Sequence, residues 1–290
     1  MTPLQQQQDR IGWIGLGLLG FEMAQHLQRH LHTHQLPSLT VWNRTSEKAE
    51  TFRTAAAPGV QIVSSLEDFF VCAADGSRPK ANVIFTSLTN DAAVEQVYET
   101  LLRCASTAQE QITFVETGTL YPELSLPAQL VWVASGDQDA VDRLSPYFGV
   151  MSQKILDLKT TDVAAASTLK LLGNYIIISN TSILAESVNV ARKSGLDPQH
   201  LVSLIDTLLP APLLMGYSRQ LVKGAEDEVG VNMTINIAEK DVACVRRWAK
   251  SKDAPMPIAD EVHQNFVVAK EKGHNSKWDF LVDSINSRGE

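Results

Sequence analysis

The sequence is poor in several features that would mark particular classes of protein. Its 290 residues include only three cysteines, Cys72, Cys104 and Cys244, which lie far apart and lack metal-ligand spacing. We therefore expect reduced, mostly buried thiols and no metal site. No apolar run approaches the roughly 20 residues that a membrane span needs.

Positive charge is also scarce. The formal net charge is −8, which argues against nucleic acid or an anionic membrane as the main partner, although a local basic patch stays possible. The opening stretch "MTPLQQQQDR" is polar and has no apolar signal core, so we expect residues 1–9 to form a disordered tail rather than an export signal. With an ordinary apolar content of 44%, these features are typical of a cytoplasmic, enzyme-like chain.

The first half of the chain alternates short apolar runs with helical segments. This rhythm predicts a parallel sheet wound on both faces by helices. One predicted helix begins with Ser46 as its N-cap, and another covers "SLEDFFVCAAD". The predicted strands are 11–15, 39–43, 60–63, 82–88 and 112–117, followed by "QLVWVAS" and 154–158.

The second half is helical throughout. A largely apolar segment without proline, 161–194, predicts one helix of about 50 Å, long enough to cross from one domain into another. Gly195 follows its basic last turn, as is typical of a helix end. We expect a boundary near Lys159, with a Rossmann-like domain at 10–159 and an all-helical domain at 160–290. Further helices are predicted at 198–209, 211–223, 235–251 and 257–272, with a short one from Ser276.

A glycine-rich turn lies between the first predicted strand and its helix. The spacing Gly-x-Gly-x-x-Gly in this context is typical of a dinucleotide site: the first glycine permits a tight turn and the second lets the backbone approach a pyrophosphate. The third lets helix and strand pack closely, and the helix N-terminus holds the negative charge. The residues of this turn are Gly15, Leu16, Gly17, Leu18, Leu19 and Gly20.

The end of the second predicted strand indicates which dinucleotide binds. An acidic residue there would bond the ribose hydroxyls of NAD, but the sequence has Asn43, Arg44 and Thr45. Arginine offers a two-pronged contact to a phosphate, and no carboxylate is present to repel the 2′-phosphate of NADP. We therefore expect NADP; the alternative is that Arg44 is an ordinary surface arginine.

Two polar residues interrupt the long apolar helix. Lys170 and Asn174 are four residues apart, so they lie on one helical face. A lysine among apolar neighbours is expected to have a lowered pKa, which suits proton exchange with a hydroxyl or carbonyl oxygen. The alternative is a structural lysine whose ammonium group reaches solvent. The dipeptide Lys240-Asp241 alone indicates only a solvated ion pair.

The motifs occur together in an order that resembles the β-hydroxyacid dehydrogenase family. That family includes 3-hydroxyisobutyrate dehydrogenase and the glyoxylate/succinic semialdehyde reductases, and is related to 6-phosphogluconate dehydrogenase. The similarity extends from Arg10 to about Ile285. Its motifs are "IGWIGLGLLG", "VWNRTSEKAE", "VETGTLYPE", "LKLLGN", "LAESVNVARKSGLDP" and "AEKD".

The resemblance implies a fold and a chemistry. The fold is a Rossmann-type sheet followed by an all-α domain, assembled as a homodimer or higher oligomer through the helical half. The chemistry is hydride transfer to or from a nicotinamide, with Lys170 exchanging the proton of the substrate oxygen. Thr119, Asn174 and Lys240 match substrate-binding positions. The expected cofactor contacts are completed by Leu88, Thr89, Thr117 and Lys240.

The sequence departs from the family at several positions. Gly173 and Gly118 replace an asparagine and a serine that many members have, and Glu116 replaces an aspartate. Between Ser125 and Gln129, about 30 residues, or roughly one αβ unit, are absent relative to the family. That unit includes the serine-glycine-glycine run that helps to hold a substrate carboxylate.

These patterns together predict an NADP-dependent oxidoreductase that interconverts a small β-hydroxy acid, or a similar alcohol, and its aldehyde or keto form. Two alternatives stay open. The shortened segment allows a catalytically impaired NADP-binding protein or a shortened gene product. Imine reductases share the scaffold but usually replace the lysine, so the retention of Lys170 favours carbonyl or hydroxyl chemistry.

Overall fold

The computed structural model describes residues 8–73, 76, 80–117, 130–223, 234–273, 281 and 285. By its internal contacts the chain divides into two compact units. The first comprises Met1–Trp132 with Asp139–Leu156, and the second comprises Val133–Gln138 with Asp157–Glu290. Within the described ranges, no helix is both long enough and apolar enough to cross a membrane.

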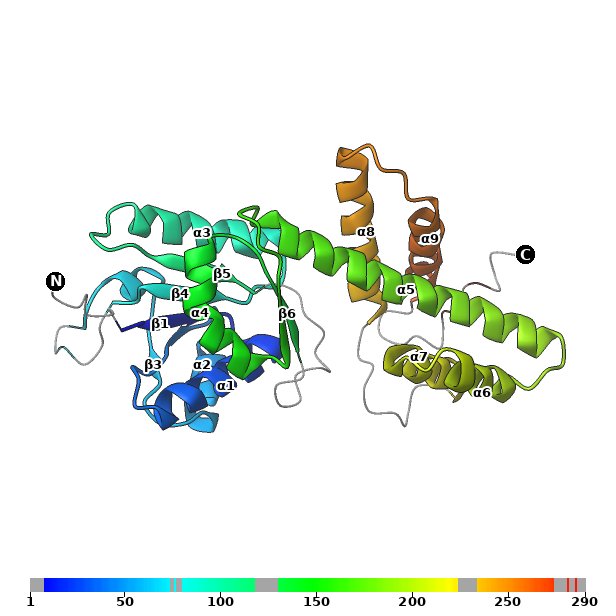
Figure 1. Cartoon of the computed structure of the whole chain (residues 1–290), viewed down its shortest axis with the longest axis horizontal. Coiled ribbons are helices and arrows are strands. Elements are labelled where there is room, and N and C mark those ends of the chain that lie inside the picture. The colour runs from blue at the N-terminus through cyan, green and yellow to red at the C-terminus, as the bar shows by residue number, and fades with distance from the viewer. Residues whose placement is uncertain are drawn as a thin grey trace. The chain divides into compact units, whose positions relative to one another are not determined.

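A five-stranded sheet forms the centre of the first unit (Figure 1). The strand order is β3-β2-β1-β4-β5, and each neighbouring pair is parallel. This arrangement confirms the predicted doubly wound sheet, and the order reverses between β1 and β4, where ligands of such sheets bind. The strands are β1 (Ile11–Ile14), β2 (Thr40–Trp42), β3 (Gln61–Ile62), β4 (Val83–Thr86) and β5 (Thr113–Glu116).

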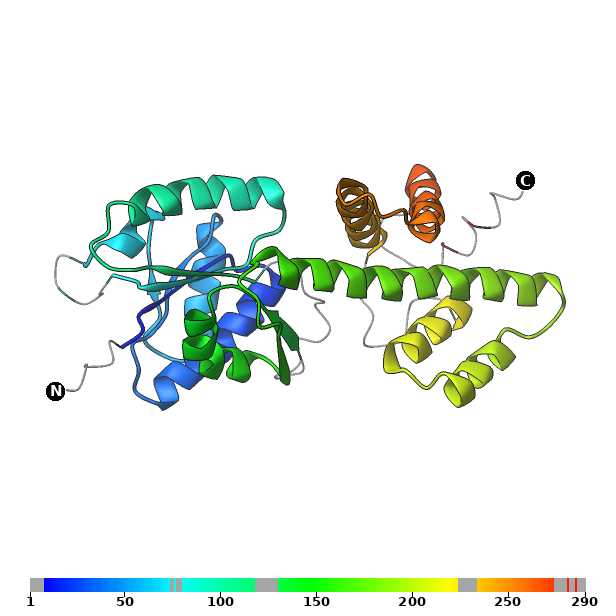
Figure 2. The same cartoon turned by 45° about the horizontal axis from the view of Figure 1, so that its top comes forward.

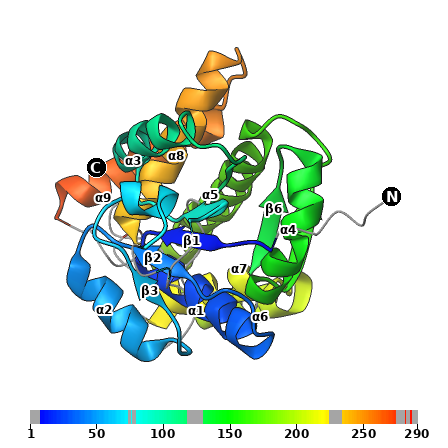
Figure 3. The same cartoon turned by 90° about the vertical axis from the view of Figure 1, so that its left-hand side faces the viewer.

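Helices cover both faces of this sheet, as Figure 3 shows. On one face, Trp13 of β1 and Phe85 of β4 share a core with three helices: α1 (Leu18–Thr33), α2 (Ser46–Ala55) and α4 (Gln138–Met151). On the other face, Ile14 and Ile84 pack with α3 (Asp91–Ala105) and the short 3-10 helix η1 (Glu67–Phe70). Alternate residues of β1 and β4 therefore point to opposite faces of the sheet and pack into two separate hydrophobic cores.

The last two strands do not join the main sheet. β6 (Val131–Ala134) and β7 (Lys154–Asp157) form a separate two-stranded sheet. Trp132 of β6 stacks on Phe148 of α4, with ring centroids 5.0 Å apart. Both residues belong to the core that contains Trp13 and Phe85. The shortened segment between Ser125 and Gln129 lies outside the described residues.

Two local predictions in the first unit were wrong. The expected helix at 65–75 is only the single turn η1, because the carbonyl of Phe69 accepts a 2.8 Å hydrogen bond from the backbone of Ala81 instead of from a following helical turn. Helix α2 begins one residue earlier than expected, with Thr45 as its N-cap and Ser46 inside the helix.

The second unit is organised around the long helix α5 (Ala164–Lys193). It begins later than predicted, at Ala164, whose backbone N–H donates a 2.9 Å hydrogen bond to the Asp162 carboxylate. Figure 2 shows α6 (Gln199–Leu208) and α7 (Pro212–Lys223) on one side of α5, and α8 (Ile235–Ser251) and α9 (Pro257–Glu271) on the other. The helix predicted from Ser276 lies outside the described residues.

Candidate active site

The glycine turn lies beyond the carboxyl end of β1, next to the point where the strand order reverses. Gly15 has a φ of 95°, and a Cβ at this position would collide with the backbone oxygen of Ser87. A Cβ at Gly20 would collide with the carbonyl oxygen of Gly15. The indole nitrogen of Trp13 donates a 3.0 Å hydrogen bond to that same carbonyl. The fold itself therefore requires the first and third glycines.

Gly17 has a different role. Its φ of −67° and ψ of 177° suit any residue, and a Cβ there would meet nothing within 4 Å. Gly17 is the N-cap of α1, and no side chain among the described residues bonds to the cap. The first amide groups of α1 thus face an open approach, which fits a bound pyrophosphate. Packing does not explain this glycine, whereas the close approach of a ligand does.

The loop after β2 is tied to the glycine turn by Asn43. Its Oδ1 accepts a 2.8 Å hydrogen bond from the backbone of Leu16, and its Nδ2 donates a 2.9 Å bond to the carbonyl of Thr45. Arg44 and Thr45 are exposed, and Arg44 has no ion pair within the described part of the chain. The guanidinium group is therefore available to a phosphate at this edge of the sheet.

The predicted cofactor residues after β4 and β5 reach the same edge. Leu88 and Thr89 follow β4, while Thr117 follows β5 and is buried. The Thr117 hydroxyl donates a 2.8 Å bond to the carbonyl of Thr86, so it holds the two strand ends together. Thr119 and Gly118 lie outside the described residues.

Glu116, at the end of β5, belongs to a small polar cluster. It accepts a hydrogen bond from the Thr86 hydroxyl, which also lies 3.0 Å from the Tyr98 hydroxyl of α3. Burial raises the pKa of Tyr98 to about 12, so the phenol keeps its proton even in alkaline solution. The carboxylate that replaces the expected aspartate is thus engaged with the sheet.

Lys170 and Asn174 meet at one carboxylate in the second unit. The Nζ of Lys170 lies 3.3 Å from Oδ2 of Asp241, and the Nδ2 of Asn174 lies 2.6 Å from the same oxygen. The Lys170 side chain is 15% exposed and Asp241 is 2% exposed. Helix α5 thus presents both residues on one face, as their spacing predicts, and α8 supplies the acceptor.

The prediction that Lys240-Asp241 is merely a solvated pair was wrong for the aspartate. Lys240 is 41% exposed and its Nζ lies 3.4 Å from Oδ1 of Asp241, but the carboxylate itself is buried. Asp241 lies on the buried stripe of α8, together with Ala238, Val242 and Val245. A carboxylate on an apolar stripe is rarely buried without partners, and this was the signal in the sequence that could have identified it.

Charge and burial compete at Lys170. Burial lowers the pKa of Lys170 from its ordinary value, whereas the Asp241 carboxylate raises it and the Lys240 charge lowers it. The net direction is downward. Since proton exchange is most effective when the pKa of the group lies near the working pH, this shift suits a general acid or base.

The charges of the cluster do not cancel. With Lys170 and Lys240 protonated and Asp241 ionised, two positive groups face one negative group. An anionic group, such as a carboxylate, is therefore favoured near the exposed ammonium of Lys240.

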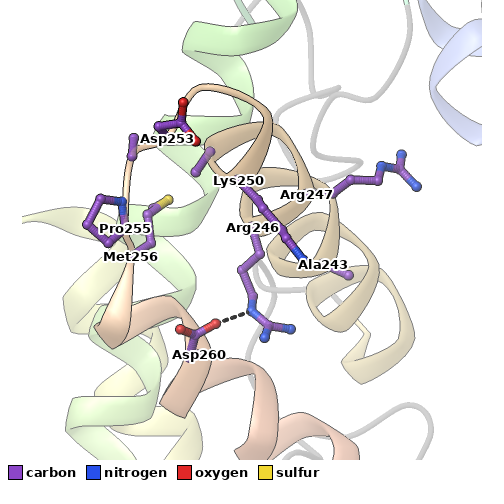
Figure 4. A pocket seen from close by; sticks show the side chains of 10 residues that line it. Ala243, Arg246, Arg247, Lys250, Asp253, Pro255, Met256 and Asp260 are labelled. Carbon is purple, nitrogen blue, oxygen red and sulfur yellow. Dashed lines mark hydrogen bonds and ion pairs between the residues drawn. The ribbon is translucent and has the colours of Figure 1, made fainter.

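A separate open pocket of about 600 Å³ lies at the C-terminal end of α8 and the start of α9 (Figure 4). Arg246 and Arg247 line it, and Arg246 donates a 2.6 Å hydrogen bond to Asp260. Lys170, Asn174 and Asp241 are not among its lining residues. This pocket is thus a surface feature distinct from the Lys170 cluster.

The described part of the chain contains free cysteines and no cluster of metal-binding side chains. No group of three or more His, Cys, Asp or Glu residues there is placed to hold a metal ion. All three cysteines are free, but Cys72 is exposed and Cys104 and Cys244 are partly exposed. The expectation of mostly buried thiols was therefore wrong.

Comparison with domain families assigns both halves of the chain. Residues 10–129 match the NAD binding domain of 6-phosphogluconate dehydrogenase. Residues 164–281 match a domain described as "NAD-binding of NADP-dependent 3-hydroxyisobutyrate dehydrogenase".

Individual relatives agree with this assignment. The NADH-dependent oxidoreductase ucdB of Aspergillus ustus is 26% identical, over 87% of this chain and 90% of its own length. Glyoxylate/succinic semialdehyde reductase 2 of Arabidopsis thaliana is 25% identical, over 91% of this chain and 75% of its length. The structure of 3-hydroxyisobutyrate dehydrogenase from Mycobacterium tuberculosis has the same fold, with a TM-score of 0.72 at 15% identity, covering 96% of this chain and 99% of that one. The chain belongs to the β-hydroxyacid dehydrogenase family and is an NAD(P)-dependent oxidoreductase that acts on CH-OH groups.

Proposed function

We propose that the chain is an NADP-dependent oxidoreductase that interconverts a small β-hydroxy acid, or a similar alcohol, and its aldehyde or keto form. The observation that carries this proposal is the buried cluster of Lys170, Asn174 and Asp241. In this assignment residues 10–159 bind the cofactor, and residues 160–290 form the all-helical domain that supplies Lys170.

The proposed chemistry divides between cofactor and chain. The hydride is supplied or accepted by the nicotinamide ring when the cofactor is bound. In the reductive direction the Lys170 ammonium donates a proton to the carbonyl oxygen, and in the oxidative direction its neutral amine takes the proton of the hydroxyl. Asn174 orients that oxygen. Lys240 and Thr119 bind the rest of the substrate, and Lys240 attracts its carboxylate.

The choice of NADP rests on the end of β2. Arg44 and Thr45 are exposed there, and no carboxylate follows the strand to repel a 2′-phosphate. NAD is the competing cofactor, since one relative bears the name of an NADH-dependent enzyme. Direct comparison of the two cofactors decides between them.

We also propose that the chain forms a homodimer or a higher oligomer through its helical half. Three apolar side chains on α5 are strongly exposed: Ile176 at 58%, Ile183 at 54% and Val190 at 64%. They are spaced seven residues apart and so form one stripe along the helix. A second copy of the helix would cover this stripe.

Two other functions remain as outcomes of the test. The shortened segment between Ser125 and Gln129 favours a protein that binds NADP with impaired catalysis. Imine reduction is the other, although a lysine held by a buried carboxylate supports proton transfer to an oxygen.

The experiment measures NADPH oxidation with glyoxylate, succinic semialdehyde, related carbonyls and a cyclic imine, beside calorimetric binding of NADPH. We expect turnover of a carbonyl, and its loss by about 10²–10⁴-fold in Lys170→Met with NADPH binding retained. Lys250→Met removes an exposed lysine of α8 and is the matched control. Equal activity of Lys170→Met and the unchanged chain would overturn the proposal; NADPH binding without any turnover would favour the impaired protein.

A further inference from the structure

We propose that Asp241 is a positioning residue: its buried carboxylate holds the Lys170 ammonium and the Asn174 amide side by side, so that both address one substrate oxygen. The inference rests on the proposed function for the role of Lys170. It adds a residue of α8 to a site otherwise built on α5.

The geometry of the carboxylate carries this proposal. Oδ2 of Asp241 receives both α5 donors, Lys170 at 3.3 Å and Asn174 at 2.6 Å. Oδ1 lies 3.4 Å from the Nζ of Lys240. One buried group therefore contacts three residues with proposed roles in substrate chemistry, and no other carboxylate among the described residues forms an ion pair with Lys170.

Burial explains why this carboxylate matters. Asp241 is 2% exposed, so water does not replace the contacts that it makes. Without the negative charge, the two ammonium groups of Lys170 and Lys240 would face each other with no counter-ion between them. The rotamers of Lys170 and Asn174 would also lose the acceptor that fixes them.

The protonation of Lys170 gives a readout that is specific to this arrangement. In the described part of the chain, the titratable groups that act on Lys170 are Asp241, Lys240 and Cys244, all on α8. Burial and Lys240 lower the pKa of Lys170, while Asp241 and Cys244 raise it. Removing the Asp241 charge must therefore lower that pKa further.

The test compares the unchanged chain with Asp241→Asn, which preserves the size of the side chain. Trace acetylation at a series of pH values, with the acetylated Lys170 peptide quantified by mass spectrometry, gives the pH at which Lys170 loses its proton. We expect this midpoint to fall by about one to three pH units in Asp241→Asn. A midpoint equal to that of the unchanged chain would overturn the proposal.

Glu239→Gln is the matched control because Glu239 is a carboxylate on the same helix that bonds to His263 and Lys270 instead of Lys170. It should leave the Lys170 midpoint in place. Circular dichroism and thermal unfolding establish that each variant is folded, and Asp241→Ser, which is smaller and uncharged, replaces Asp241→Asn if that variant does not fold. Asp241→Glu restores the negative charge but places it one methylene further from the backbone. The pH midpoint of Lys170 should therefore recover more fully than the rate of carbonyl reduction, which also depends on the position of the carboxylate.

Turnover provides a second, separable readout. In Asp241→Asn we expect kcat for carbonyl reduction to fall about tenfold or more at mildly alkaline pH, where Lys170 has lost its proton, while the KM for NADPH is unchanged. The acetylation experiment needs no substrate. If the unchanged chain shows no turnover, the proposed function fails while the acetylation profile still decides whether Asp241 controls Lys170.

Discussion

The side-chain amide of Asn174 donates a 2.6 Å hydrogen bond to Oδ2 of Asp241, 67 residues further along the chain. The bond joins the interior faces of α5 and α8, and Lys170 reaches the same oxygen from one helical turn away. Both partners are nearly inaccessible to solvent. The pair therefore links α5 and α8 inside the helical unit, next to Lys170.

Gly17→Ala should weaken cofactor binding without harming the fold. Its backbone conformation suits alanine and the added Cβ meets no protein atom, so the free energy of unfolding should change by less than about 1 kcal/mol. The methyl group would occupy the space that a pyrophosphate needs. Calorimetry with NADPH and denaturant unfolding measure the two effects.

Gly15→Ala is the contrasting variant at the same turn. Its Cβ would collide with the backbone of Ser87, and its φ of 95° is strained for alanine, so stability and binding should both fall. If Gly17→Ala bound NADPH as tightly as the unchanged chain, the pyrophosphate would not lie at this turn.

Arg44→Ala should weaken NADPH binding much more than NADH binding, because only NADPH carries the 2′-phosphate. A charge-assisted contact of this kind contributes about 1.5–3 kcal/mol, or roughly 10- to 150-fold in Kd. Calorimetric titration with both cofactors measures the ratio. The control is Arg53→Ala, which removes an exposed arginine of α2 that pairs with Glu50. Equal losses of affinity for NADPH and NADH in Arg44→Ala would refute the NADP assignment.

Gly173→Ala should stabilise the helical unit. Gly173 lies inside α5, and a Cβ there meets nothing within 4 Å. Alanine in a helix interior is favoured over glycine by about 1 kcal/mol, which denaturant unfolding would detect. Gly149, inside α4, is equally open and offers a parallel test in the other unit. A loss of stability at both positions would contradict the open space described for them.

The Glu239 cluster predicts a loss of stability in acid. Burial acts to raise the pKa of Glu239, but hydrogen bonds and charges of Lys270 and His263 outweigh it and hold the pKa below its ordinary value of 4.5. A depressed carboxyl pKa stabilises the folded state above the unfolded pKa, and that stability is lost as the pH falls through the folded pKa. Unfolding measured from neutral pH to below pH 4.5 should therefore show a steeper decline in the unchanged chain than in Glu239→Gln.

Glu271→Gln, an exposed carboxylate on α9, is the matched substitution for that measurement. It should keep the steep decline. Parallel curves for the unchanged chain and Glu239→Gln would show that the cluster does not couple folding to pH.

Ile176→Glu combined with Ile183→Glu should dissociate the proposed oligomer. Both side chains are more than half exposed on α5, so the substitutions place charges on the proposed interface without entering the core of the unit. Analytical ultracentrifugation should show a shift toward the monomer. Leu102→Glu alters an equally exposed apolar residue on α3 and should leave the oligomer intact. An unchanged oligomer mass in the double variant would show that the interface lies elsewhere.

Features that depend on residues close together in the sequence could be predicted from the sequence. The turn at Gly15–Gly20 and the face shared by Lys170 and Asn174 follow from spacing alone, and the structure agrees. Asp241 was misjudged because its partners lie on another helix, about 70 residues away, and a dipeptide carries no information about that distance. The helix at 65–75 was predicted too long because the carbonyl of Phe69 bonds to the backbone of Ala81, a partner that a local helical pattern does not reveal.

The bond from the Trp13 indole to the carbonyl of Gly15 has a thermodynamic consequence. Trp13 is fully buried and stacks on Phe85, with ring centroids 5.4 Å apart, so the backbone of the glycine turn is anchored in the hydrophobic core. A ligand that binds only the intact turn must then raise the melting temperature of the first unit by mass action, in proportion to the logarithm of its concentration. Because the buried indole bonds directly to the glycine turn, a cofactor that binds at this turn should change the fluorescence of Trp13.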